Sequence, residues 1–81
     1  MRLPDLLPDT PAFVLEVEDV TAADPVSVRL RELGFVADEP VRILAAGPFG
    51  RDPLLVQIGY TRFALRRTEA ARIRIRTEAQ P

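Results

Sequence analysis

The sequence predicts a mainly β protein, built as a small five-stranded barrel with one intervening α-helix. Five short segments alternate apolar and polar residues, and this period of two is typical of half-buried strands. Between the first and second of these segments, apolar residues recur at helical spacing, after a capping residue and before a glycine. Because the chain has only 81 residues, its core is thin and a single domain is expected.

Composition indicates one folded domain over residues 1–81, with its core at about 6–76 and a polar tail at 77–81. Apolar residues make up 47% and charged residues 28% of the chain, and the net charge is -1, which is outside the range of disordered proteins. No apolar run approaches the roughly 20 residues of a membrane helix, and the first residues lack the apolar segment of a signal peptide. We therefore expect a cytoplasmic protein that does not insert into the membrane.

The residue types that the chain lacks exclude much catalytic and metal chemistry. It contains no Cys and no His, which removes disulfides, thiolate ligands, the commonest metal ligand and the usual general base. Four acidic residues could hold a hard cation or Fe(II) through oxygen ligands, but we expect them on an exposed strand face and a solvated turn. We predict that the protein is not an enzyme and that it has no cofactor and no metal site. The four acidic residues are Glu16, Glu18, Asp19 and Asp24.

The first strand is predicted within the segment FVLEVEDV, residues 13–20. Its alternation places Phe13, Leu15 and Val17 on the inward face. The opposite, outward face is predicted to carry Val14, Glu16 and Glu18. Residues 3–12 contain three prolines, so we expect an extended lead-in there and no helix.

A helix is predicted over residues 25–33. Asp24 can cap its free N–H groups, and Pro25 suits the first helical position, which needs no hydrogen-bond donor. Gly34 can adopt the positive φ that ends a helix, and Phe35 then folds back onto the last turn. Gly34 and Phe35 are therefore predicted as structural residues. The inward stripe consists of Val26, Leu30 and Leu33, with Ser27, Arg31 and Glu32 off it.

Two further strands, 41–46 and 54–58, are predicted to form a hairpin around the turn-rich loop GPFGRDP. This loop lacks the lysine and the following helix of a phosphate-binding loop. Only a register that pairs Leu44 with Leu55 on the outside buries both apolar sets together. The inward residues of the first of these strands are then Val41, Ile43 and Ala45.

The rest of the chain predicts strands at 61–65 and 72–76, joined by a short helical turn at about 68–71 with Thr68 as its cap. Gly59 lies in the turn before the first of these strands and is predicted as structural. Five short strands with one helix between the first two favour a partly open barrel of the SH3-like type. An OB-type barrel is the alternative. The inward residues are Phe63, Leu65, Ile73 and Ile75.

Charge is divided unevenly along the chain. Residues 1–41 hold three arginines and nine acidic residues, whereas residues 42–81 hold eight arginines and three acidic residues. The late arginines could face an acidic protein, a nucleic acid or solvent alone. We do not expect nucleic acid, because Phe49 and Tyr60 are the only aromatic residues predicted on the outside for base stacking. The predicted basic stripe consists of Arg62, Arg66, Arg67, Arg72, Arg74 and Arg76.

Two sequence blocks resemble the FeoA family of small proteins that serve bacterial ferrous iron uptake. They are RLRELGFV at residues 29–36 and GYTRFALRRTEA at residues 59–70, within a resemblance that covers about residues 6–76. After the first block this chain has Ala37 and Asp38, where the family commonly has Pro-Gly. The resemblance implies an SH3-like barrel that acts through protein contacts, with the cytoplasmic GTP-binding domain of the FeoB permease as partner. A nucleic-acid-binding barrel, or a regulatory domain like those fused to metal-dependent repressors, is the alternative.

The interface hypothesis concerns the outside of the predicted hairpin. Leu44 and Leu55 break the polar alternation there, and Pro48 and Phe49 lie at the tip of the adjoining loop. We expect this patch to receive an apolar side chain from the permease or, in weak self-association, from a second copy of the domain. In the alternative, the predicted helix or the leucine-rich N-terminus covers both leucines. The full predicted interface consists of Leu44, Leu55, Pro48, Phe49, Tyr60 and Arg62.

Overall fold

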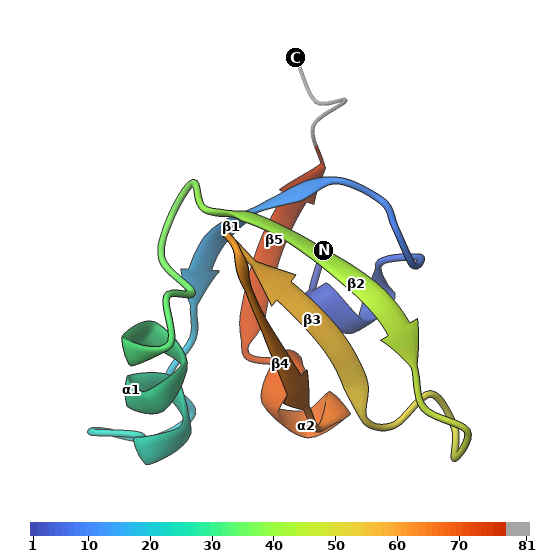
Figure 1. Cartoon of the computed structure of the whole chain (residues 1–81). Helices are drawn as coiled ribbons and strands as arrows, with labels where there is room; N and C mark the ends of the chain where they lie inside the picture. The colour runs from blue at the N-terminus through green and yellow to red at the C-terminus, as the bar shows by residue number, and fades with distance from the viewer. Residues whose placement is uncertain (78–81) are drawn as a thin grey trace.

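Five antiparallel strands form one curved sheet in the computed structural model, with neighbours in the order β4-β3-β2-β1-β5 (Figure 1). The structure describes residues 1–77, so all but the first residue of the predicted polar tail lies outside the described residues. The predicted mainly β fold, with five strands, one intervening helix and a late helical turn, is confirmed.

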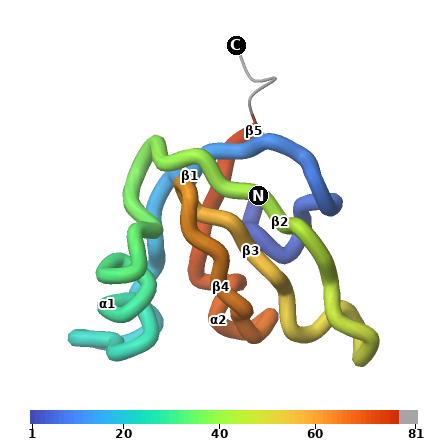
Figure 2. The backbone as a smooth tube through the Cα atoms, in the orientation of Figure 1, coloured from blue at the N-terminus to red at the C-terminus, as the bar shows by residue number. Residues whose placement is uncertain are grey.

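Three short helical elements lie before or between the strands. Figure 2 shows α1 to one side of the sheet and α2 at the end of β4, with the N-terminal residues behind β2 and β3. The elements are η1 (Leu3–Asp5), β1 (Ala12–Val17), α1 (Pro25–Glu32), β2 (Pro40–Ala46), β3 (Leu54–Ile58), β4 (Thr61–Leu65), α2 (Arg67–Ala70) and β5 (Ile73–Thr77).

The hydrophobic core draws on every strand of the sheet and on α1. Burial of these apolar side chains is the main favourable term in the folding of such a domain. The buried residues include Val14, Ile43, Val56, Leu65, Ile73 and Ile75 from the strands, with Leu30 and Phe35 from the helix and its C-terminal turn.

Helix α1 begins and ends as predicted. The Asp24 carboxylate accepts a hydrogen bond from the Val26 N–H at 3.0 Å. At the other end Gly34 has a φ of +111°, and Phe35 donates its N–H to the Leu30 carbonyl at 3.1 Å. This return bond closes the helix and delivers the fully buried Phe35 side chain to the core.

Ser27 corrects the predicted outline of the helix, because it lies off the apolar stripe and is nevertheless fully buried. Its hydroxyl donates a hydrogen bond to the Glu18 carbonyl at 2.6 Å, which satisfies the buried polar group. Leu30 is buried, and Val26 and Leu33 are partly buried against the core. A hydrogen bond as well as apolar packing therefore holds α1 beside the end of β1.

A β-bulge makes the predicted inward face of β1 partly wrong. Between Val14 and Glu16 the register with β5 shifts, which leaves Leu15 without a partner. The extra residue breaks the alternation, so Leu15 is exposed, and Phe13 is only half-buried. The buried residues of this strand are Ala12, Val14 and Val17, so the predicted outward position of Val14 is also wrong.

A second bulge, in β2, overturns the predicted pairing of Leu44 with Leu55. The register with β3 shifts after Ile43, and Ala45 rather than Leu44 lies opposite Leu55. The predicted burial of Ala45 is also wrong, because the shift turns this residue to the outside, where it is exposed. Val41 and Ile43, which precede the bulge, are buried as predicted.

The N-terminal residues differ from the predicted extended lead-in, because they form the 3-10 helix η1. The Asp5 carboxylate accepts a hydrogen bond from the Arg2 N–H at 3.0 Å, which holds this turn. Leu3 and Leu6 are buried, so the core includes a residue before the predicted start at position 6.

The chain after β3 follows the prediction closely. Gly59 has a φ of +57° in the turn between β3 and β4. Helix α2 begins at Arg67, and its cap is not Thr68 as predicted, because the Glu69 carboxylate accepts a hydrogen bond from the Arg66 N–H at 2.9 Å. Of the predicted inward residues, Leu65, Ile73 and Ile75 are buried and Phe63 is half-buried.

Candidate protein-interaction surface

The outer side of β2, β3 and β4 carries an apolar row beside a polar one. In the first row three exposed apolar residues face one another across the strands, and in the second a glutamine lies between two exposed arginines. Because alternate residues of a strand share a face, the two rows lie side by side. We call these six residues the outer face: Ala45, Leu55 and Ala64 in the apolar row, and Arg42, Gln57 and Arg62 in the polar row.

The bulge in β2 changes the centre of the predicted apolar patch. Leu44 is half-buried, whereas Leu55 is 37% exposed. Leu55 has Ala45 on one side and Ala64 on the other. The surface therefore presents a single leucine between two alanines, where the sequence pattern indicated a pair of facing leucines.

The exposed aromatic residues of the predicted interface lie at opposite ends of β3. Phe49, which is 83% exposed, and Pro48 lie in the loop between β2 and β3, whereas the fully exposed Tyr60 lies in the turn before β4. Figure 1 shows this loop and this turn at the two ends of the hairpin. Since β3 has five residues, and a strand of that length spans about 17 Å, the structure does not bring Phe49 and Tyr60 into one patch.

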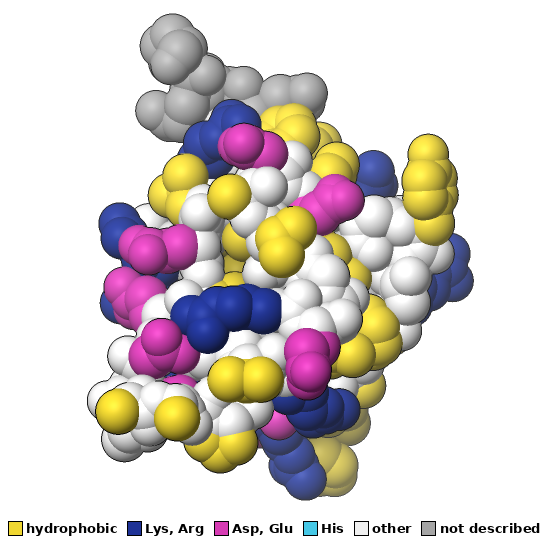
Figure 3. Space-filling model, turned by 90° about the vertical axis from the view of Figure 1, so that its left-hand side faces the viewer, with side chains coloured by type: hydrophobic (Ala, Val, Ile, Leu, Met, Phe, Trp, Pro, Cys, Tyr) yellow, Lys and Arg dark blue, Asp and Glu magenta, His cyan; other side chains and the backbone are white. Residues whose placement is uncertain are grey.

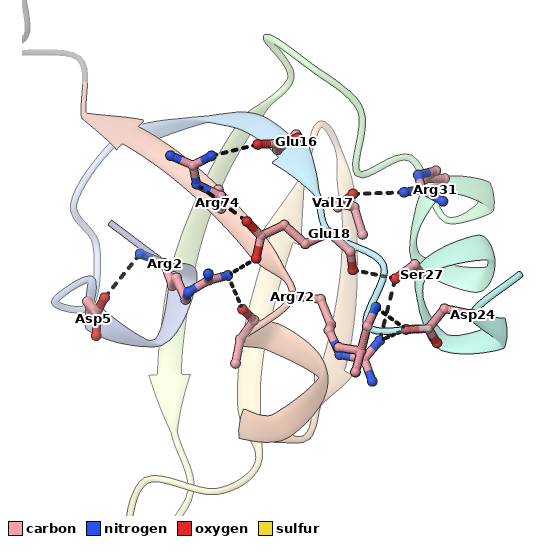
Figure 4. A network of polar contacts seen from close by, with 12 residues as sticks. Arg2, Asp5, Glu16, Val17, Glu18, Asp24, Ser27, Arg31, Arg72 and Arg74 are labelled. Carbon is pink, nitrogen blue, oxygen red and sulfur yellow. Dashed lines mark hydrogen bonds and ion pairs between the residues drawn. The ribbon is translucent and has the colours of Figure 1, made fainter. Parts of the chain in front are cut away.

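Most charged side chains of β1, β5 and the segments beside α1 form ion pairs with one another (Figure 4). Arg74 contacts Glu16 at 2.6 Å, and Arg2 contacts Glu18 at 2.5 Å. The hydrogen bond from Arg2 lowers the pKa of Glu18 below its ordinary value. These groups meet because β1 pairs with β5, which joins the acid-rich first half of the chain to its arginine-rich end. The further pairs are Arg29–Glu69, Arg31–Asp19, Arg72–Asp24, Arg74–Glu18 and Arg76–Asp38.

The side of the molecule that carries α1 is accordingly a mixture of both signs of charge. Figure 3 shows acidic and basic side chains next to each other on this side, with apolar side chains scattered between them. Arg76 also lies over the ring of Phe13, 4.6 Å from its centre. Its carboxylate partner, Asp38, has a φ of +71°, a conformation that aspartate adopts more readily than most residues.

Asp24 is buried at the N-terminus of α1, which corrects the prediction of a solvated turn. Its carboxylate accepts hydrogen bonds from the N–H groups of Val20 at 2.9 Å and Val26 at 3.0 Å, and pairs with Arg72. The Val20 bond is the largest cause that lowers the pKa of Asp24, and Val26 and Arg72 add to it against the opposing effect of burial. Asp24 is therefore a structural residue of the helix start.

Four exposed arginines have no ion pair with any residue of 1–77. All lie within residues 40–68, where Asp52 is the only acidic residue. The predicted stripe is not a continuous basic wall, because Arg72, Arg74 and Arg76 are engaged with acidic residues. The four arginines are Arg42, Arg51, Arg62 and Arg66.

A groove of about 360 Å³ borders the outer face where β1 and β2 begin. The sequence pattern did not indicate the groove, because it forms only where three strands come together. The groove is lined by Pro11, Ala12, Phe13, Pro40, Val41, Arg42, Gln57 and Gly59.

Within the described part of the chain, no three or more Asp, Glu, His or Cys side chains gather as they would around a metal ion. Residues 1–77 also contain no helix that is long and apolar enough to cross a membrane.

Comparisons with known proteins connect this geometry to one family. A family model for the FeoA domain matches residues 1–77. The FeoA protein of Stenotrophomonas maltophilia, a prokaryotic SH3 domain protein crystallised with zinc, is 53% identical to this chain, with a TM-score of 0.86. That match covers 94% of this chain and 89% of the other. The predicted SH3-like architecture is thereby confirmed.

Two more distant structures share the fold. The iron(II) transport protein A of Clostridium thermocellum is 29% identical, with a TM-score of 0.80, over 96% of this chain and 46% of that one. The FeoA protein of Chlorobium tepidum is also 29% identical, with a TM-score of 0.80, over 98% of this chain and 71% of that one. A comparison with curated protein sequences gave no match.

Proposed function

Because this chain belongs to the FeoA family, which is associated with ferrous iron transport, we propose that it is an accessory protein of ferrous iron uptake. It acts without catalysis, through contact with the cytoplasmic GTP-binding domain of a FeoB-type permease. The protein works in the cytoplasm and needs no cofactor for this contact.

The exposed apolar row of the outer face is the observation that carries the proposal. Leu55 is a large apolar side chain at the centre of three strands, and the polar row borders it on one side. An apolar centre with a polar rim is the usual anatomy of a protein interface. Phe49 lies in the adjoining loop and is almost completely exposed, so it can add a second anchor.

A direct binding measurement tests the proposal. Isothermal titration calorimetry of the chain against the purified GTP-binding domain of the FeoB permease from the same genome should give saturable binding at one site per chain. Titrations with and without a GTP analogue then establish whether the contact depends on the nucleotide. Failure of the wild-type chain to bind this domain in either state would contradict the proposed function.

A further inference from the structure

We propose that the outer face recognises an acidic surface of its protein partner, whose carboxylates contact Arg42 and Arg62 while an apolar side chain contacts Leu55. The inference rests on the proposed function for the identity of the partner. It adds the chemistry that this partner must present, and the face of the domain that receives it.

The distribution of ion pairs carries the first step. On β1 and β5 the arginines already have carboxylate partners within the chain, for example Arg74 with Glu16 at 2.6 Å. Arg42 and Arg62 are exposed and have no such partner among the residues that the structure describes. Although the whole chain has a net charge of -1, its uncompensated positive charge lies on the side formed by β2, β3 and β4.

The position of these charges relative to the apolar row carries the second step. Arg42 and Arg62 lie on either side of Gln57, in the row next to Leu55. Arg66 is exposed two residues beyond Ala64, in the chain direction away from Arg62. The apolar row therefore has basic residues on two sides, which matches a partner whose apolar anchor is surrounded by carboxylates.

The same arrangement disfavours two other occupants. A symmetric dimer through this face would bring two copies of Arg42 and Arg62 into one interface, and the outer face contains no acidic residue that could pair with them. A nucleic acid would meet an apolar row at the centre of the face, and the exposed aromatic residues Phe49 and Tyr60 lie at opposite ends of β3. An acidic protein surface is the occupant that satisfies both the charges and the apolar row.

Neutralising the two arginines tests the inference. The double variant Arg42→Gln/Arg62→Gln is compared with Arg29→Gln, a control on α1 whose ion pair with Glu69 is long, at 3.6 Å. Affinity for the GTP-binding domain of the permease is measured at ionic strengths from about 50 to 300 mM. The wild-type affinity should fall as salt increases, and each lost arginine should weaken binding about two- to fivefold at low salt. The control should bind like the wild type, and thermal unfolding should be unchanged in both variants.

The outcomes separate the inference from the proposed function. If the wild type binds the permease domain and the double variant binds equally well with the same salt dependence, the acidic-surface inference is overturned and the proposed function stands. If the wild type does not bind, the proposed function fails and the inference fails with it. Binding of duplex DNA or RNA that the same double variant abolishes, or a dimer in sedimentation that it disrupts, would assign the face to a nucleic acid or to a second copy and overturn the inference.

Discussion

Asp24, which caps α1, forms an ion pair with Arg72, which lies 48 residues later and directly precedes β5 (Figure 4). Arg72 also lies 3.4 Å from the Ser27 hydroxyl, so its guanidinium bridges two positions at the start of the helix. The carboxylate that caps α1 thus also attaches the helix to β5. Since this pair lies outside the outer face, its loss should change stability and leave partner binding unchanged.

Acidification should destabilise the protein as Asp24 and Glu18 become protonated. Folding lowers the pKa of Asp24 below its ordinary value of 3.8, and that of Glu18 below 4.5. Because both pKa values are lowered, their stabilising contribution is fully present above the ordinary values and is lost as pH falls through the folded-state values. We expect a Tm that is steady from about pH 6 to 8 and decreases below about pH 4.5. Thermal unfolding followed by circular dichroism over this pH series measures it.

The variant Asp24→Asn isolates the part of the acid response that belongs to the helix cap. It keeps one acceptor oxygen and removes the charge, so its Tm at pH 7 should be lower than that of the wild type. Its further decrease on acidification should be smaller, since less remains to be protonated. If the Tm values of Asp24→Asn and of the wild type decrease in parallel over the whole pH range, Asp24 does not contribute to the acid response.

Replacement of Gly34 by valine should destabilise the domain by about 1 kcal/mol or more, because a β-branched residue is strained at positive φ. Gly34 has a φ of +111° and ends α1. Urea denaturation measures the difference in the free energy of unfolding. Ala37→Val, at an exposed position three residues later, is the control and should change stability by less than about 0.5 kcal/mol. Equal stabilities of the two variants would refute the assigned role of Gly34.

Gly47, directly after β2, should tolerate no side chain. A Cβ atom there would lie closer than 3.0 Å to the backbone carbonyl of Asp52 and to the backbone nitrogen of Pro53. Gly47→Ala should therefore cost about 1–3 kcal/mol in the free energy of unfolding, the range of overpacked sites. The neighbouring exposed Ala46 offers the control Ala46→Ser, for which little change is expected. A Gly47→Ala variant as stable as this control would show that the loop backbone can move away.

Leu55→Glu should leave the fold nearly intact and weaken binding to the permease domain by about 2 kcal/mol, the scale of an interface hot spot. Leu55 is already 37% exposed, so the new carboxylate can remain in water. Val28→Glu, at a 44% exposed position on α1, is the matched control and should bind normally. Tm and affinity are measured on the same samples. If Leu55→Glu lowers the Tm and the affinity together, the interface hypothesis is wrong.

Leu44→Glu should behave differently from Leu55→Glu. Leu44 is half-buried at the bulge of β2, so a carboxylate there loses more hydration and should lower the Tm more. The sequence pattern treated the two leucines as equivalent, because both break the polar alternation of the hairpin. If the Tm of Leu44→Glu is as high as that of Leu55→Glu, the bulge does not bury Leu44 more than Leu55 in solution.

Features that depend on neighbouring residues were predictable. Asp24 and Gly34 act within one turn of their own positions, so the limits of α1 follow from the residue types. In β3 the alternation of buried and outward residues is uninterrupted, and the pattern of the segment 54–58 matches its burial. The same alternation placed Arg62 correctly on the outside, and the turn-rich loop composition placed Phe49 there.

The sequence by itself determined the five strands, α1 and the late helical turn, the closure of α1 by Gly34 and the resemblance to the FeoA family, because these depend on residue types and short-range spacing. Only the tertiary structure decided the bulges at Leu15 and Leu44, and with them which leucine the outer face presents. It also decided that Arg74 is neutralised by Glu16 while Arg62 has no partner among residues 1–77. A bulge depends on the register against a partner strand, and an ion pair depends on which strands are neighbours, and local periodicity carries neither.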